Sequence, residues 1–218
     1  MIKMPKTITQ IQVQKKRKKR CSIFLNDEFA FGLDQDIVLQ FGLKKGDVLS
    51  DQQIEVILLN EEKKKAKDRA LNFLSYRDRS EKEIRTKLKD VGYEENIVEW
   101  VIGELKRLKF IDDERFAHSY AQTQMITRPM GEYFLKKELQ QKGIEAELIE
   151  QAVEKVYQED DQFSVAFELA QQRKKRYNDI DEMKAKKRVS DFLLRRGFSW
   201  EIVSEVLERW NEIGIGHN

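Results

Sequence analysis

The chain of 218 residues contains one cysteine, Cys21, and two prolines, Pro5 and Pro129. A single cysteine excludes an internal disulfide framework and suits a reducing compartment, so we expect a cytoplasmic protein. No apolar run approaches the roughly 20 residues that a membrane helix needs, and no signal-peptide pattern follows the N-terminal charges. The sequence therefore predicts neither a disulfide-rich secreted protein nor a membrane protein.

Residues that carry chemistry are also scarce. The two histidines, His118 and His217, are far apart in sequence. We find no dinucleotide fingerprint, phosphate loop, zinc-ligand cluster or nucleophile elbow. The adjacent carboxylates Asp112 and Asp113 invite a metal or acid–base interpretation, but no third ligand is near, and capping of the next helix explains them. We therefore expect no enzyme, no cofactor and no metal.

The composition and the distribution of charge favour small helical units. Charged residues make up 37% of the chain and apolar residues 40%, which is enough apolar surface for cores in small helical units with much exposed surface. Residues 1–67 hold 14 Lys and Arg against 9 Asp and Glu, a net charge of +5, which leaves −3 for the rest of a chain whose total is +2. Contacts with nucleic acid are therefore expected to be local rather than spread over the whole surface.

An internal frame organises the chain, centred on Gly92, Gly143 and Gly197. Apolar residues recur at seven fixed offsets from these glycines, from eight before to thirteen after. The offsets eight before, four before and one after are occupied by Ile84, Leu88 and Tyr93, by Leu135, Leu139 and Ile144, and by Val189, Leu193 and Phe198. A glycine that closes a helix in the left-handed conformation brings the residue after it against the residue four before it. Each copy therefore predicts a helix, a glycine stop and a second helix, with room for one more helix before them.

The segment before the repeats reads as a small β-containing domain. Thr7–Val13, Cys21–Leu25 and Glu28–Leu33 predict a three-stranded sheet, with Asn26-Asp27 as a turn. The basic run 15–20 falls in the first hairpin turn. It is either a solvated, repulsive turn or a tip that contacts phosphates.

Asp34 is expected to cap a short helix, and from Asp51 a long helix is expected to run into the first repeat. In that repeat, Ser80 and Glu83 predict a capping box, in which each side chain accepts a hydrogen bond from the other residue's amide. The predicted domains are 1–60 (small, β-rich, with short helices), three-helix repeats at 61–112, 113–160 and 161–212, and a tail at 213–218.

The third repeat carries the strongest basic stretch, with ten Lys and Arg against four acids between Gln172 and Arg196. It is either two solvated helix faces or an anion-binding face. Trp200 and Trp210 are interpreted as core residues, and Trp100 as partly exposed.

Three segments resemble the RecX family of recombination regulators. They are Ala70-Leu71 with Ser80–Leu88, the run Phe110-Ile111-Asp112-Asp113-Glu114-Arg115-Phe116-Ala117, and Lys137–Ile144. The resemblance covers about residues 68–210, and residues 7–60 resemble the N-terminal extension of the Gram-positive members. It implies tandem three-helix repeats in an elongated, mainly α array, with no catalytic activity.

The resemblance also implies a function. It points to a monomer that binds the RecA filament in its groove on DNA, with weak single- and double-stranded DNA binding of its own, and that lowers strand exchange, ATP hydrolysis and co-protease activity in DNA repair. The alternatives are a DNA-binding protein that acts alone and a helical scaffold for an unrelated protein. The candidate contact residues are Lys15, Lys16, Arg17, Lys18, Lys19, Arg20, Arg85, Lys89, Lys136, Lys137, Lys142, Arg173, Lys174, Lys175, Lys186, Lys187, Arg195 and Arg196.

Overall fold

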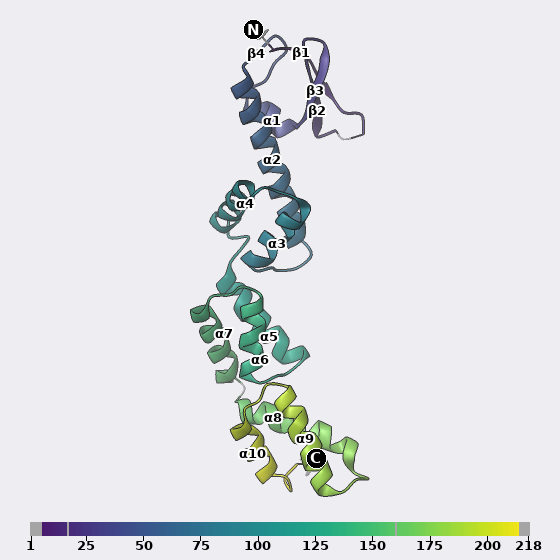
Figure 1. The fold of residues 1–218 in the computed structure, drawn as a ribbon, viewed down its shortest axis with the longest axis vertical. Coiled ribbons are helices and arrows are strands. Elements are labelled where there is room, and N and C mark those ends of the chain that lie inside the picture. Colours follow the sequence, from purple (N-terminus) through teal and green to yellow (C-terminus); the bar gives the residue numbers. More distant parts are fainter. Residues whose placement is uncertain (1–5, 17, 160, 214–218) are drawn as a thin grey trace. The chain divides into compact units, whose positions relative to one another are not determined.

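A small antiparallel sheet with one short helix comes first in the chain, and the rest of the described chain is helical (Figure 1). The structure, a computed structural model, describes residues 6–16, 18–159 and 161–213. The N-terminal elements are β1 (Lys6–Val13), β2 (Arg20–Leu25), β3 (Glu28–Asp34), α1 (Gln35–Gln40) and β4 (Val48–Leu49). The helices that follow are α2 (Asp51–Leu74), α3 (Glu81–Val91), α4 (Glu95–Arg107), α5 (Asp113–Thr127), α6 (Glu132–Gln141), α7 (Ala146–Glu159), α8 (Gln162–Lys174), the short 3-10 helix η1 (Lys175–Tyr177), α9 (Glu182–Arg195) and α10 (Trp200–Glu208). The predicted mainly α fold with a small β-containing start is confirmed.

The sheet is antiparallel, with strand order β3-β2-β1-β4. Ile8, Ile23 and Leu33 are fully buried on it, because alternate side chains of a strand face the same side. Asn26 and Asp27 have φ of 50° and 71°, the left-handed values of a tight hairpin turn, which confirms the predicted turn. The prediction of three strands was wrong by one: β4 has two residues, too few to show an alternating pattern, and only its pairing with Lys6 and Thr7 reveals it.

The expected continuous helix into the first repeat is confirmed, since α2 runs from Asp51 to Leu74 without a break. Ser50 caps it, accepting from the Gln53 amide at 3.2 Å while the Gln53 side chain accepts from the Ser50 amide at 2.8 Å. Asp34 caps α1 through the Asp36 amide at 3.0 Å. None of the described helices is both long and apolar enough to span a bilayer.

The three frame glycines close their helices as predicted. Gly92, Gly143 and Gly197 have φ of 98°, 82° and 86°, values open to glycine because it lacks a Cβ. In each copy the amide of the residue after the glycine donates to the carbonyl of the residue four before the glycine: Tyr93 to Leu88 at 3.2 Å, Ile144 to Leu139 at 3.2 Å, and Phe198 to Leu193 at 3.3 Å. This is the bond of the Schellman motif. The frame positions eight and four before each glycine are fully buried in all three copies.

One interpretation of the aromatic residues was wrong. Trp210 is buried, but Trp200 is 59% exposed. Trp200 is the first residue of α10, directly after its cap Ser199. It stands three residues after Gly197, an offset at which the other copies carry Glu95 and Ala146, so the frame never required it to be apolar.

The predicted capping box of α3 forms only on one side. Ser80 Oγ accepts from the Glu83 amide at 3.3 Å, but the Glu83 carboxylate pairs with Arg77 and Lys142 instead. Asp112 caps α5 through the Arg115 amide at 2.9 Å.

The chain divides into two compact units that share α3. One contains Met1–Tyr76 and Lys87–Arg107, and the other contains Arg77–Thr86 and Leu108–Asn218. The helices that end at the frame glycines, α3, α6 and α9, are the middle helices of the repeats. In the second unit, the start of one middle helix contacts the glycine turn at the end of the next one. Ser80 Oγ donates to the Lys142 carbonyl at 2.6 Å. Gly131 has the equivalent position in the second repeat, and its amide donates to the Arg196 carbonyl at 2.8 Å. A Cβ on Gly131 would lie 2.2 Å from the Gly197 oxygen, so this contact requires glycine.

The glycine turns generate a stability prediction. Gly143→Ala should lower the free energy of unfolding by about 2 kcal/mol, because it imposes a left-handed alanine and because the new Cβ would lie 2.5 Å from the Lys82 side chain. Gly92→Ala should cost about 1 kcal/mol, since its surroundings are open. Urea denaturation of the variants measures both.

Gly103→Ala is the matched control. Gly103 is an exposed residue within α4 with nothing within 4 Å of a new Cβ, so alanine should stabilise the protein by about 0.5–1 kcal/mol. Equal effects at Gly92, Gly103 and Gly143 would contradict this explanation of the frame.

Candidate functional site

The first candidate surface is the turn between β1 and β2. Lys15, Lys16, Lys18 and Lys19 are all exposed, and no carboxylate of the described chain pairs with them. Arg17 lies outside the described residues. These lysines form one cluster of like charge, here called the hairpin lysines.

Arg20, the last residue of the basic run, has a structural role instead. Its guanidinium lies 2.8 Å from Glu61 Oε1 and donates to the Gly32 carbonyl at 3.0 Å. Glu61 is 2% exposed and its other oxygen accepts from the Asp34 amide at 2.6 Å. Lys65 approaches the same carboxylate at 3.2 Å. The buried carboxylate therefore fastens the β2–β3 hairpin to α2, and it needs Arg20 as a counterion.

Carboxylates hold the candidate residues of α3 and α6. Arg85 pairs with Glu81 at 2.7 Å and Lys89 with Glu95 at 2.7 Å. Lys136 lies between Glu132 and Glu150, whose hydrogen bonds raise its pKa. Lys137, by contrast, is exposed and has no carboxylate partner in the described part of the chain.

Lys142 belongs to a network that joins α3 to α6. It lies 2.8 Å from Glu83, and Arg77 lies 2.9 Å from the same carboxylate. Burial alone would raise the pKa of Glu83, but the hydrogen bonds and charges of Arg77 and Lys142 outweigh it and bring the pKa to about 2. Next to it, burial and the hydrogen bond to Glu138 raise the pKa of Tyr120 to about 12. This cluster is a structural joint rather than a free basic surface.

The basic stretch of the third repeat divides into two groups. Lys174 donates to the carbonyls of Trp210 and Ile213 at 2.9 and 2.8 Å, and Lys186 pairs with Glu182 at 2.7 Å. Arg173 and Arg196 stack on Phe192, with their guanidinium carbons 4.9 and 5.3 Å from the ring centroid. The second group is exposed and has neither a carboxylate partner nor a ring contact among the described residues: Lys175, Arg176, Lys184, Lys187 and Arg195. We call this second group the exposed third-repeat cations.

Sequence reasoning did not select Arg176, Lys184 or Arg188 as contact residues. Arg188 is exposed, and its guanidinium stacks on Tyr177 at 5.3 Å. The basic composition of the stretch included these residues, but which cations are paired depends on contacts between α8, η1 and α9.

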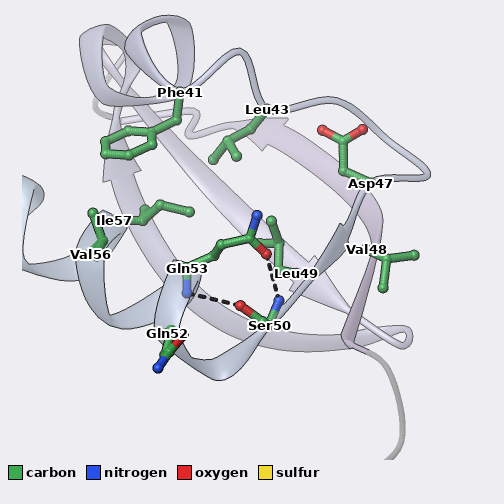
Figure 2. Close-up of a pocket in the computed structure, with 10 residues that line it drawn as sticks. All are labelled: Phe41, Leu43, Asp47, Val48, Leu49, Ser50, Gln52, Gln53, Val56 and Ile57. Atoms are coloured by element: carbon green, nitrogen blue, oxygen red, sulfur yellow. Dashed lines mark hydrogen bonds between the residues drawn. The ribbon is translucent and has the colours of Figure 1, made fainter.

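A pocket of about 450 Å³ lies in the N-terminal domain (Figure 2). Phe41, Leu43, Leu49 and Ile57 line it, and hydrogen bonds join Ser50 and Gln53 at its rim. Asp47, Ser50, Gln52 and Gln53 line it as well, but no Lys or Arg does, so it is not part of a basic surface. Across the described ranges, no group of three or more His, Cys, Asp and Glu is placed to hold a metal.

The Glu83 network predicts a pH-dependent stability. Because the folded pKa of about 2 lies below the ordinary 4.5, the carboxylate stabilises the fold fully above pH 4.5 and loses this effect as the pH falls toward 2. Glu83→Gln should therefore cost on the order of 2 kcal/mol near neutral pH and progressively less below pH 4.5. Chemical denaturation at a series of pH values measures the difference.

Glu150→Gln is the control for this measurement. The Glu150 side chain is 63% exposed, so loss of its ion pair with Lys136 should cost less than about 1 kcal/mol. A Glu83→Gln effect that stays constant down to pH 2 would contradict the assigned network.

Comparison with known proteins gives consistent similarities along the chain. Family models of the regulatory protein RecX match its N-terminal domain at residues 6–50 and its first, second and third three-helix domains at residues 66–105, 112–153 and 159–207. The regulatory protein RecX of Geobacillus sp. (strain WCH70) is 37% identical over 204 residues, which cover 92% of this chain and 75% of the relative. That of Bacillus subtilis (strain 168) is 36% identical over 202 residues, or 93% and 76%.

Solved structures agree with the sequence matches. A crystal structure of regulatory protein RecX superposes with a TM-score of 0.76 at 33% identity, covering 94% of this chain and all of that one. The structure of RecX from Lactobacillus salivarius gives a TM-score of 0.64 at 29% identity, covering 71% and 99%.

Proposed function

Because this chain belongs to the RecX family of regulatory proteins, we propose that it binds the RecA filament on DNA and restrains strand exchange, ATP hydrolysis and co-protease activity. The observation that carries the proposal is the match of all four family segments, in order, to a chain whose repeats leave a defined set of cations unpaired. A filament groove is lined by both protein and DNA. A partner for it needs local basic surface on an otherwise balanced charge, as this chain has with a net charge of +2.

The repeat joints suit a protein that acts by position rather than by chemistry. The Ser80–Lys142 and Gly131–Arg196 hydrogen bonds fix where one middle helix starts against the end of the next. Side chains on neighbouring repeats of the second unit are thereby held in fixed relation. A fixed array of contacts can lie across adjacent subunits of a filament and oppose the movement that accompanies ATP turnover. This wedge is the mechanism that we propose.

Paired and unpaired cations then have different tasks. Lys142 joins the end of α6 to α3 through Glu83, Lys136 joins α6 to α7 through Glu150, and Arg85 pairs within α3 with Glu81. The exposed third-repeat cations, together with Lys137 and the hairpin lysines, remain available to an external anion. We propose these exposed groups as the contact residues for the filament and its DNA.

ATP hydrolysis by RecA of the same organism, measured on single-stranded DNA, tests the proposal. Addition of this protein at well below one copy per RecA subunit should inhibit hydrolysis, since one wedge would act on several subunits. The triple variant Lys175→Glu, Lys187→Glu, Arg195→Glu should weaken inhibition by about tenfold or more, because each reversal replaces attraction by repulsion at a polyanion.

A charge-matched control is Lys44→Glu, Lys45→Glu, Lys155→Glu. These three lysines are also exposed but lie outside the proposed contact set, so this variant should inhibit like the wild type. Equal loss in both triple variants would assign the effect to net charge alone. No inhibition by the wild-type protein, with tight binding to naked DNA, would favour a DNA-binding protein that acts alone.

A further inference from the structure

Three arginines and two aromatic rings of the third repeat form a continuous series of cation–π contacts. Tyr177 is in contact with both Arg188 and Arg173, whose guanidinium carbons are 5.3 and 5.6 Å from its centroid. Phe192 is in contact with both Arg173 and Arg196, at 4.9 and 5.3 Å. The order is therefore Arg188, Tyr177, Arg173, Phe192, Arg196. We call these five residues the arginine ladder; α8, η1 and α9, together with Arg196 at the end of α9, supply them.

The ladder concentrates positive charge without neutralising it. Among the described residues, no carboxylate pairs with Arg173, Arg188 or Arg196. Arg173 Nε is buried without a hydrogen-bond partner, and Arg196 donates to the Pro129 carbonyl at 3.0 Å, a neutral acceptor. Burial lowers the pKa of Arg196, and the neighbouring charges of Arg128 and Arg173 lower it further.

Other cations of the same repeat are treated differently. Arg209 also stacks on a ring, with Phe163 at 4.6 Å, but it has a carboxylate partner in Glu205 at 3.2 Å. A stack that served packing alone would be equally stable with a paired arginine. The ladder instead holds three guanidinium groups against aromatic rings and leaves their charge to be met from outside.

We propose that the arginine ladder binds the phosphodiester backbone of a nucleic-acid strand. A guanidinium fixed by ring stacking has lost its flexibility in advance, so its planar fork can meet a phosphate with two hydrogen bonds at little further entropic cost. A row of separate forks fits a polymer that repeats its phosphate along one line. Lys175, Arg176 and Lys187, next to the ladder in sequence and exposed, extend the row. The assignment rests on the proposed function, in which DNA lies within reach of the bound protein.

Charge-preserving variants distinguish the effect of a planar guanidinium group from the effect of its positive charge alone. Arg188→Lys keeps the charge at an exposed position but removes the planar fork, and Tyr177→Leu keeps every charge but removes the shared ring. Each should weaken binding of the full-length protein to a fluorescent single-stranded oligonucleotide by about five- to tenfold at fixed salt. The double variant should lose little more than either single one, because ring and fork act as one unit.

Arg209→Lys is the matched control, since it changes a stacked arginine that already has a carboxylate partner; its affinity should equal that of the wild type. Circular dichroism and thermal unfolding of each variant show whether it is folded. A duplex oligonucleotide and poly-aspartate serve as competitors in the same anisotropy assay. The ladder assignment predicts that either nucleic acid competes far better than poly-aspartate of equal charge.

Two results would overturn the assignment. Wild-type affinity in both Arg188→Lys and Tyr177→Leu would make the ladder a packing feature, and equal competition by poly-aspartate would assign it to an acidic protein surface. RecA-dependent ATP hydrolysis, measured in parallel, keeps the two proposals apart. Inhibition that persists while the ladder variants bind DNA normally would remove only the ladder, whereas absent inhibition by a wild-type protein whose ladder binds DNA would remove the proposed regulation of RecA.

Discussion

The left-handed glycine at the end of each middle helix is the constraint on which the repeats depend. At Gly143 and Gly197 it turns the chain and also creates a surface without side chains, against which Lys82 and Phe134 pack. A side chain at either glycine would strain the turn and occupy this contact at once. The same position in the first repeat, Gly92, has open space around it. There the glycine is required only by its backbone conformation.

Some Lys and Arg side chains of this protein pair with carboxylates and stabilise the fold, and others remain exposed to an external anion. Glu61 and Glu83 each pair with two cations. Through Arg20 and Lys142, respectively, these carboxylates fasten one element to another. Removal of one partner from such a group leaves a charge with poor solvation, which costs more than loss of an exposed pair. The cations that remain after this pairing, and not the total count of Lys and Arg, define the surface that an anionic partner can meet.

In the third repeat, some arginines are held by aromatic rings rather than by carboxylates. Arg173 and Arg196 are partly buried but contact aromatic rings, and Arg196 also donates to a carbonyl oxygen, instead of pairing with carboxylates. Ring faces attract a guanidinium without cancelling its charge. This arrangement gives fixed orientation and retained charge together, whereas an ion pair would give orientation at the expense of charge.

The sequence alone determined the repeats, because a helix stop and its apolar contacts are local: Gly143, Leu139 and Ile144 lie within six residues and specify the turn wherever they occur. The turn at Asn26-Asp27 and the long helix from Asp51 were predictable for the same reason. The strand Val48–Leu49 was not, since two residues carry no period and their partner is Lys6–Thr7.

Only the tertiary structure decided which cations are engaged. In sequence, Arg20 is equivalent to the hairpin lysines and Lys142 to Lys137. Arg20 pairs with Glu61, forty-one residues later in the sequence, and Lys142 pairs with Glu83, fifty-nine residues earlier. Side-chain pairing between distant elements depends on how helices and strands pack, and no local pattern records it. The chain's charge pattern therefore predicted local basic stretches on a nearly balanced total, while the packing determined which of these basic residues have no carboxylate partner in the described part of the chain.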